Sequence, residues 1–186
     1  MLQNFKILQN TTDIELLNKI GHGGFGQVYK CKYNDKIYAC KVYNKKKIIE
    51  SNQTPLIYNE LRVLKKLQCT QSCVKFIDSL QDQNQLYIVL EYLESPCLKD
   101  LLKSQLLTEQ QIRYVTRLLL KALQQMHALQ IIYRDFKSEH IFFTADGIKL
   151  IDFGLSAEGQ HRDTQCGTIQ YQSPEIIQWW ALELLF

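Results

Sequence analysis

The chain has 186 residues, of which 46% are hydrophobic and 22% charged, as is typical of a globular protein with one sizeable core or two small lobes. Its formal net charge of +3 is too small to indicate a surface for nucleic acid or for an anionic membrane. The sequence has neither a secretory signal nor a run near the roughly 18 apolar residues of a membrane span. Its six cysteines form no CxxC pair, which favours free thiols in the reducing cytoplasm over a disulfide framework.

Residues 15–33 alternate apolar and polar side chains around a glycine cluster, which predicts two antiparallel strands joined by a glycine-rich turn. Asn34-Asp35 then turns the chain into a third strand, KIYACKVY. Glycines in a GxGxxGxV turn allow backbone N–H groups to approach phosphate oxygens, although an ordinary glycine-rich hairpin is the alternative. A dinucleotide site is excluded, because it needs a helix directly after the glycines. The motif residues are Gly21, Gly23, Gly26 and Val28.

Lys41 lies in the third strand, between apolar neighbours, where a lysine needs an anionic partner. A helix is expected from Thr54 to about Leu67, with Thr54 as its cap and Pro55 at its first position. Glu60 lies beside the apolar stripe of this helix, so we expect it to point inward and to pair with Lys41. The alternative is an ordinary acid on the surface.

Two further strands are expected at residues 73–79 and 85–90, followed by a connection to a second lobe. Ser95-Pro96 is expected to cap a short helix at 97–103. Thr108 and Gln111 form a capping box that begins the longest helix, which runs to about Leu129. Its apolar stripe predicts core packing and no function; it consists of Ile112, Val115, Leu119, Ala122, Met126 and Leu129.

The segment IIYRDFKSEHIFF, residues 131–143, has a charged turn between two short apolar strands. Such a turn can hold Arg134, Asp135 and Lys137 rigid and exposed, although solvated charge is the alternative. A hairpin through Asp146-Gly147 is expected next. Asp152 then follows an apolar strand and precedes Phe-Gly, which is a suitable place for a metal ligand.

Together these motifs resemble the protein kinase signature: GHGGFGQV, YACK, Glu60 in a helix, YRDFKSEH, IDFG and SPE, over residues from about 15 to 180. Tyr133 before Arg134-Asp135, and the CGTxxY run, resemble the AGC group and its cyclic-nucleotide-dependent kinases. The resemblance implies an α+β, two-lobed fold. It places an extension at 1–14, an antiparallel N-lobe with one main helix at 15–93, and an incomplete, mostly helical C-lobe at 94–186.

The resemblance implies that ATP and Mg²⁺, or alternatively Mn²⁺, bind to this chain. The glycine loop would cover the phosphates, and Lys41, held by Glu60, would contact the α- and β-phosphates. Phe142 is expected to form the floor of the adenine pocket. The other expected adenine neighbours are Val28, Ala39 and the gatekeeper Leu90, with backbone groups of Glu91 and Leu93.

The family pattern also implies the groups that transfer phosphate to Ser or Thr of a protein substrate. Asp135 would take the hydroxyl proton, Lys137 would steady the γ-phosphate and Asp152 would bind magnesium. A phosphate on Thr164 would pair with Arg134. Two further implications concern Thr168, as the residue typical of Ser/Thr kinases, and an interlobe packing spine of Leu64, Phe76, Tyr133 and Phe153.

The sequence departs from the family at His140, where an Asn that binds the second metal ion is expected. An imidazole suits Mn²⁺ or Zn²⁺ better than Mg²⁺, or His140 hydrogen-bonds Asp135 or Asp152 instead. Cys97 replaces an acid that contacts ribose or a basic substrate, Ser138 replaces a Pro, and Phe142 is bulky for the adenine floor.

The end of the sequence, SPEII followed by QWWALELLF, resembles the family's central C-lobe helix with the preceding loop deleted. Glu175 would then lack its usual Arg partner, and the apolar tail would need cover. We therefore expect a partner that covers the incomplete C-lobe, or a product of a longer reading frame. Three functions stay open: an active Ser/Thr kinase, a pseudokinase or nucleotide-binding scaffold, and a nonfunctional fragment.

Overall fold

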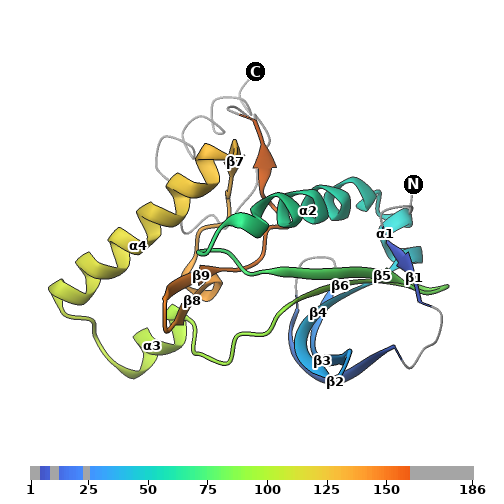
Figure 1. The fold of residues 1–186 in the computed structure, drawn as a ribbon, viewed down its shortest axis with the longest axis horizontal. Coiled ribbons are helices and arrows are strands. Elements are labelled where there is room, and N and C mark those ends of the chain that lie inside the picture. Colours follow the sequence, from blue (N-terminus) through green and yellow to red (C-terminus); the bar gives the residue numbers. More distant parts are fainter. Residues whose placement is uncertain (1–4, 9–12, 23–25, 160–186) are drawn as a thin grey trace, which may run out of the picture. The chain divides into compact units, whose positions relative to one another are not determined.

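The structure is a computed structural model that describes residues 5–8, 13–22 and 26–159. The chain divides into two compact units, residues 1–68 with 74–94 and residues 69–73 with 95–186 (Figure 1). The first unit carries the large sheet and the second carries the longest helix. Among the described helices, none is long and apolar enough to cross a membrane.

The first unit is built on a six-stranded sheet with the order β1-β5-β6-β4-β3-β2. All neighbouring strands are antiparallel except β1 and β5, which are parallel. The strands are β1 (Lys6–Ile7), β2 (Ile14–His22), β3 (Gln27–Tyr33), β4 (Lys36–Asn44), β5 (Phe76–Gln81) and β6 (Gln85–Glu91).

The turn between β3 and β4 is the two-residue hairpin that the sequence predicts. Asn34 and Asp35 have φ of 47° and 60°, the left-handed conformation that this turn requires of both central residues. The strand predicted from Cys73 begins instead at Phe76. Cys73 bridges to Leu150, so residues 69–73 join the second unit.

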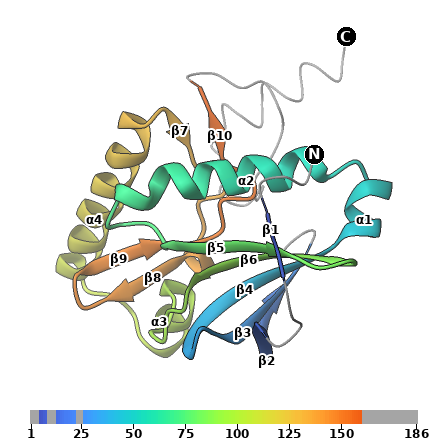
Figure 2. The ribbon, with the colours of Figure 1, turned by 45° about the vertical axis from the view of Figure 1, so that its right-hand side comes forward.

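Two helices complete the first unit: α1 (Lys45–Glu50), which the sequence analysis missed, and α2 (Thr54–Lys66). Helix α2 lies across one face of the sheet (Figure 2). Pro55 lies in its first turn as expected, but Thr54 is already helical and the N-cap is Gln53, without a side-chain cap bond. The predicted cap was therefore wrong by one residue. The 3-10 turn η1 (Leu67–Cys69) follows α2.

The other face of the sheet carries its own core of buried side chains, which includes Cys40 and Val42 on either side of Lys41 along β4. Successive side chains of a strand point to opposite faces, so this core lies on the face opposite Lys41. The remaining members are Ile14, Cys31, Leu80, Tyr87 and Val89. All five described cysteines are free.

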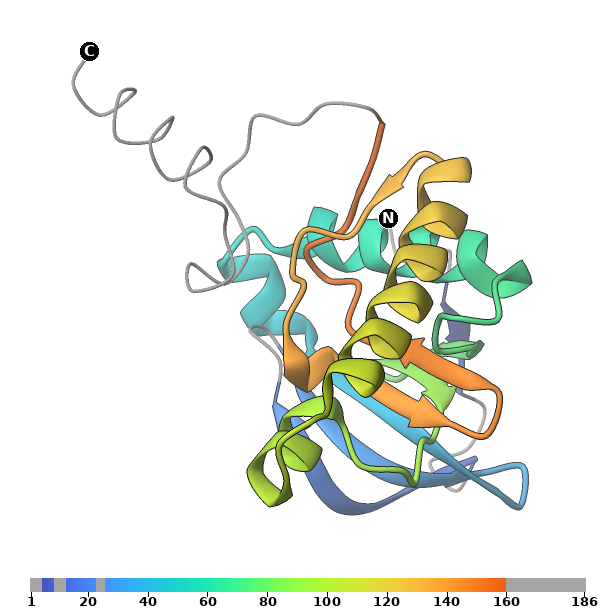
Figure 3. The same ribbon diagram turned by 90° about the vertical axis from the view of Figure 1, so that its left-hand side faces the viewer.

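The second unit contains α3 (Leu98–Ser104) and α4 (Glu109–Ala128), the hairpin of β8 (Ile141–Thr144) and β9 (Gly147–Leu150), and the pair β7 (Ile131–Ile132) and β10 (Ala157–Glu158), with the turn η2 (Ser138–His140) before β8 (Figure 3). The hairpin turns at Ala145-Asp146, and Gly147 takes a φ of 131° as its second strand begins.

The capping box that begins α4 is confirmed. The Gln111 N–H donates to Thr108 Oγ1 at 3.3 Å, and the Thr108 N–H donates to Gln111 Oε1 at 2.8 Å. For α3 the cap is Cys97 and not Ser95. The predicted α4 stripe is buried at Val115, Ala122 and Met126, whereas its first member Ile112 is 52% exposed.

Candidate active-site residues in the two units

In the first unit, Lys41 and Glu60 form a buried ion pair. Their relative exposures are 8% and 3%, and Lys41 Nζ donates to Glu60 Oε1. Tyr43 Oη donates to the other oxygen, Oε2, at 2.7 Å. The expected pair is therefore present, and the surface alternative for Glu60 was wrong. Because both carboxylate oxygens accept a bond, the buried charge of Glu60 is compensated.

Strand register places several expected nucleotide neighbours on the Lys41 face of the sheet. Val28 pairs with Lys41, and Leu90 pairs with Ala39. Ala39 and Lys41 are two residues apart, so all four side chains share one face. This apolar face with one cation is suited to a flat base and an attached anion.

The glycine-rich turn lies between β2 and β3. A Cβ on Gly26 would lie 2.8 Å from both Tyr43 Cδ1 and the Val42 carbonyl oxygen, so this position has room only for glycine. At Gly21 the nearest atom is Val28 Cβ at 3.8 Å, an ordinary contact. The expected motif residue Gly23 lies outside the described residues.

The chain leaves β6 at Glu91, whose N–H donates to the Lys75 carbonyl at 2.9 Å. The Glu91 carboxylate accepts the Lys75 N–H at 3.2 Å. These bonds fix the backbone that leads to Leu93, which is half-buried. A base bound here would thus form a hydrogen bond with the carbonyl oxygen of Glu91 and not with its N–H, which is already bonded.

In the second unit, the segment from Asp135 to His140 gathers the expected catalytic charges. Asp135 is 6% exposed, and its Oδ2 lies 3.0 Å from Lys137 Nζ. The turn η2 places His140 next, with its N–H bonded to the Lys137 carbonyl at 3.0 Å. The structure therefore brings a carboxylate, an ammonium group and an imidazole together.

His140 has a defined protonation state in this cluster. Burial is the largest effect and lowers the pKa of His140 below the ordinary 6.5. The nearby carboxylates of Asp152 and Asp135 raise this pKa and the ammonium of Lys137 lowers it, but the net shift is downward. Nδ1 lies 3.1 Å from the Asp135 carbonyl oxygen. A carbonyl only accepts, so Nδ1 carries the proton and Nε2 has a lone pair, 3.6 Å from Asp152 Oδ2.

Two charged residues of the cluster have left-handed backbones. The φ angles of Arg134 and Asp152 are 65° and 59°, a conformation that costs free energy and occurs often at functional sites. Arg134 Nε donates to the Leu155 carbonyl at 2.7 Å, and Asp152 Oδ1 accepts the Gly154 N–H at 3.3 Å. These bonds link the two strained residues to the stretch after β9.

Tyr133 lies at the centre of the aromatic contacts of this unit. It is 2% exposed, its hydroxyl donates to the Ile151 carbonyl, and burial raises its pKa well above 10.0. Its ring centroid lies 5.4 Å from Phe153 and 6.4 Å from His140. The Tyr133–Phe153 part of the expected spine is therefore present, while its continuation through Leu64 and Phe76 stays a prediction.

The predicted residue Phe142 and the neighbouring Glu139 have partners in the same unit. Phe142 forms an isolated antiparallel β-bridge with Cys97, and its side chain is half-buried. Glu139 pairs with Lys99 at 2.7 Å. The expected loop and tail residues Thr164, Thr168 and Glu175 lie outside the described residues.

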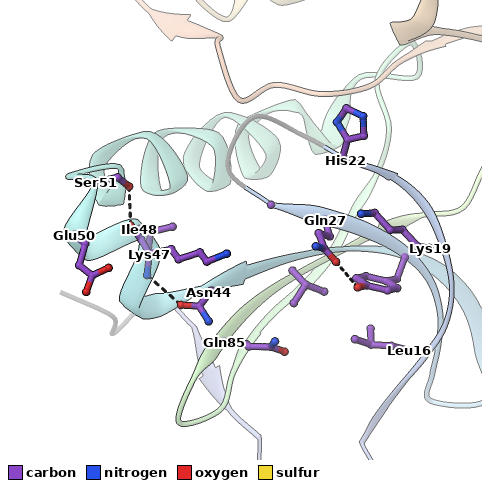
Figure 4. Close-up of a pocket in the computed structure, with 13 residues that line it drawn as sticks. Leu16, Lys19, His22, Gln27, Asn44, Lys47, Ile48, Glu50, Ser51 and Gln85 are labelled. Atoms are coloured by element: carbon purple, nitrogen blue, oxygen red, sulfur yellow. Dashed lines mark hydrogen bonds between the residues drawn. The ribbon is translucent and has the colours of Figure 1, made fainter.

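A cavity of about 840 Å³ lies in the first unit, but Lys41 does not line it (Figure 4). Leu16, Val42 and Ile48 provide apolar walls, and Lys19 and Lys47 provide charge. Val42 belongs to the core opposite Lys41, so this cavity is separate from the face that carries the ion pair.

Sequence reasoning missed Tyr43 as a partner of Glu60. The signal was available, because Tyr43 follows Lys41 by two residues in the same strand and so shares its face. The contact of His140 with the Asp135 carbonyl agrees with one of the alternatives expected for His140, a hydrogen bond to Asp135.

Sequence comparisons with known proteins show which family this chain resembles. The model of the family described as "Protein kinase domain" matches residues 14–182. The chain is 35% identical to a RAC family serine/threonine-protein kinase homolog of Dictyostelium discoideum, over 91% of the chain and 42% of the relative. It is 34% identical to a cAMP-dependent protein kinase, catalytic subunit-like, of Caenorhabditis elegans, over 94% and 47%.

The mouse cGMP-dependent protein kinase 2 is also 34% identical, over 89% of the chain and 22% of the relative. The chain thus spans less than half the length of each of these three relatives. Because the family model covers most of the sequence, the chain belongs to the protein kinase family, and the relatives that it resembles are serine/threonine kinases.

Proposed function

We propose that this chain transfers the γ-phosphoryl group of ATP to Ser or Thr hydroxyls of protein substrates. The observation that carries the proposal is the cluster of Asp135, Lys137, His140 and Asp152 within one unit. Phosphoryl transfer requires positioning and neutralised charge more than covalent chemistry. This cluster combines a base, a cation and a carboxylate that can hold metal.

In this proposal the first unit binds the nucleotide. Lys41, oriented by Glu60, contacts the α- and β-phosphates, while the glycine-rich turn from Gly21 to Val28 covers them. The adenine base lies against the apolar sheet face and forms hydrogen bonds with the backbone carbonyl of Glu91 and with the backbone of Leu93. The expected residues on that face are Val28, Ala39 and Leu90.

Asp135 acts as the base in the transfer step. Its carboxylate accepts the proton of the substrate hydroxyl as the new oxygen–phosphorus bond forms and the bond to ADP breaks. Lys137, 3.0 Å from Asp135, carries the positive charge that the transferred group needs.

Asp152 and His140 fit a divalent ion. The Nε2 lone pair and the Asp152 carboxylate face one another at 3.6 Å, and a cation between them removes their mutual repulsion. Among the described residues no three His, Cys, Asp or Glu side chains form a metal-binding group, so phosphate and water would complete the coordination. A bound ion would neutralise phosphate charge. The nitrogen ligand favours Mn²⁺ over Mg²⁺.

The second candidate is a nucleotide-binding scaffold without phosphoryl transfer. One observation favours it: His140 contacts both Asp135 and Asp152, the two carboxylates on which the transfer depends. If the imidazole blocks metal binding, nucleotide can still bind through Lys41.

A transfer assay with γ-labelled ATP and a mixed Ser/Thr peptide library separates these candidates. We expect transfer that Asp135→Asn abolishes and that Asp146→Asn, an exposed acid in the hairpin turn, leaves unchanged. A thermal melt with ATP and Mn²⁺ or Mg²⁺ tests binding independently, since saturating ligand at a hundred times its Kd adds about 2.7 kcal/mol. Binding without transfer supports the scaffold. If the chain neither binds ATP nor transfers phosphate, both candidates are contradicted.

A further inference from the structure

The cavity of about 840 Å³ in the first unit lies on the face of the sheet that is opposite Lys41 (Figure 4). Strands β2, β3 and β4 and helix α1 contribute most of its lining residues. Lys41, Glu60 and the residues expected beside adenine do not line it. Its volume is within the range of sites that bind small molecules. The cavity is therefore a candidate site for a ligand other than the nucleotide.

Part of the cavity wall is apolar and continuous with the core of the sheet. Val42 of β4 and Ile48 of α1 are buried. Leu16 of β2 and Tyr29 of β3 are half-buried and pack against the same core. An alkyl group placed against these side chains would leave water, and its transfer from water is favourable.

Two ammonium groups enter the cavity from opposite sides. Lys19 extends from β2 and Lys47 from α1 (Figure 4). Within residues 5–8, 13–22 and 26–159, neither ammonium group has a hydrogen-bond or ion-pair partner. The acidic residue of the lining, Glu50, lies 3.9 Å from Lys46 Nζ, one turn away on α1. Two cations that share a cavity without a counter-ion favour an anionic ligand.

Two side-chain amides of the lining present donors to the same space. Asn44 Oδ1 accepts the Lys47 N–H at 3.0 Å, so the amide oxygen is used and the NH₂ group remains. Gln27 Oε1 likewise accepts the hydroxyl of Tyr29 (Figure 4). In the part of the chain that the structure describes, neither NH₂ group has an acceptor. A ligand with acceptor oxygens, such as a carboxylate, would satisfy them.

We propose that this cavity binds an alkyl carboxylate of medium chain length, with its carboxylate between Lys19 and Lys47. The alkyl chain lies against Leu16, Val42 and Ile48. An inorganic anion would leave these apolar side chains in water, and a neutral apolar molecule would leave the cations and amide donors without acceptors. The site does not depend on the proposed function, because it shares no residue with the phosphate-transfer cluster.

Isothermal titration calorimetry of the full chain with octanoate, without nucleotide, tests the ligand chemistry. Octanoate should bind about tenfold or more tighter than butanoate, because each methylene that leaves water contributes roughly fourfold to affinity. It should exceed octanol and inorganic phosphate by a similar factor of roughly tenfold, since each of these offers only half of the ligand. Octanol that binds as tightly as octanoate would indicate adsorption to apolar surface and overturn the proposal. Phosphate that does so would indicate a site for charge alone and also overturn it.

Matched variants test the position of the ligand. Lys19→Met and Lys47→Met should each weaken octanoate binding by roughly three- to tenfold, since each removes a charged donor. Lys36→Met removes a lysine of β4 that does not line the cavity and should leave binding unchanged. All three side chains are exposed, so the variants should fold. Bound octanoate should also slow amide hydrogen exchange in β2 and α1. Equal affinities of the three variants, or unchanged exchange in both elements, would place the ligand elsewhere and refute the site.

Discussion

Nε2 of His140 faces Oδ2 of Asp152 at 3.6 Å, and with the imidazole proton on Nδ1 both atoms are hydrogen-bond acceptors. The proton of the imidazole is on Nδ1, which lies 3.1 Å from the Asp135 carbonyl oxygen. Two acceptors that face each other repel unless a cation lies between them. In the proposed function, a divalent ion would lie between these two atoms, and the preferred ion would then depend on the identity of residue 140.

We expect His140→Asn to change the metal preference of nucleotide binding. An amide oxygen is a hard ligand that suits Mg²⁺, whereas an imidazole nitrogen suits Mn²⁺. In thermal melts with ATP, the unaltered chain should gain more stability with Mn²⁺ than with Mg²⁺, and the variant should reverse this order. His140→Ala, which offers no ligand, should weaken the effect of both ions. An unchanged order in His140→Asn would show that residue 140 does not bind the metal.

The Lys41–Glu60 pair should behave as a buried ion pair in a double-mutant cycle. Glu60→Leu removes the carboxylate that Lys41 Nζ contacts at this buried site, and we expect a cost of about 3–5 kcal/mol in unfolding free energy. Combining Lys41→Met with Glu60→Leu should recover most of that loss, because an apolar pair replaces two charges. Urea unfolding of the four proteins measures the coupling. Additive losses would mean that the two side chains do not depend on each other in solution.

The two described glycines of the glycine-rich turn should differ in their tolerance of alanine. A Cβ at Gly26 would lie 2.8 Å from the Val42 carbonyl and from the Tyr43 ring, whose hydroxyl bonds to Glu60. Gly26→Ala should therefore cost about 1–3 kcal/mol and also weaken ATP binding. Gly21→Ala is the control, since its nearest neighbour is at 3.8 Å, and it should change stability by about 0.5 kcal/mol or less. Equal melting temperatures for the two variants would contradict this.

Features with a local cause could be predicted from the sequence. The Asn34-Asp35 turn and the Thr108–Gln111 capping box depend on residues that lie next to one another in the chain, and both are confirmed. The Lys41–Glu60 pair could also be predicted, because each of these charged residues lies among apolar neighbours and therefore needs a partner of opposite charge.

Features that depend on tertiary pairing could not be predicted. Strand β1 has two residues, which are too few to show a periodic pattern in the sequence. It forms because it can pair with β5 at the edge of the sheet. The sequence predicts a strand that begins at Cys73, but Cys73 forms a bridge to Leu150 of the second unit. Within the site, no side-chain pattern indicates the left-handed backbone of Arg134, whereas a hydrogen bond from His140 to Asp135 was one of the alternatives that the sequence left open.

Glu139 should titrate far below an ordinary glutamate. A hydrogen bond from Lys99 and then a backbone N–H lower its pKa from 4.5 to about 2. A lowered carboxyl pKa stabilises the folded state above pH 4.5, and that stability is lost as pH falls from 4.5 through about 2. Because the pair is partly exposed, the gain is about 1 kcal/mol or less. Lys99→Met should raise the pKa measured by NMR, whereas Lys103→Met, a nearby exposed lysine, should not.

Tyr58 of α2 should tolerate the loss of its hydroxyl but not of its ring. Its Oη is buried and finds no hydrogen-bond partner in the part of the chain that the structure describes, and burial raises its pKa. Removing an unsatisfied buried hydroxyl relieves a desolvation cost, so Tyr58→Phe should leave the melting temperature equal or higher. Tyr58→Ala also removes the ring that Phe5 contacts and should cost about 3 kcal/mol. A lower melting temperature for Tyr58→Phe would mean that the hydroxyl has a partner in solution, and equal values for both variants would mean that the Phe5–Tyr58 contact contributes nothing to holding α2.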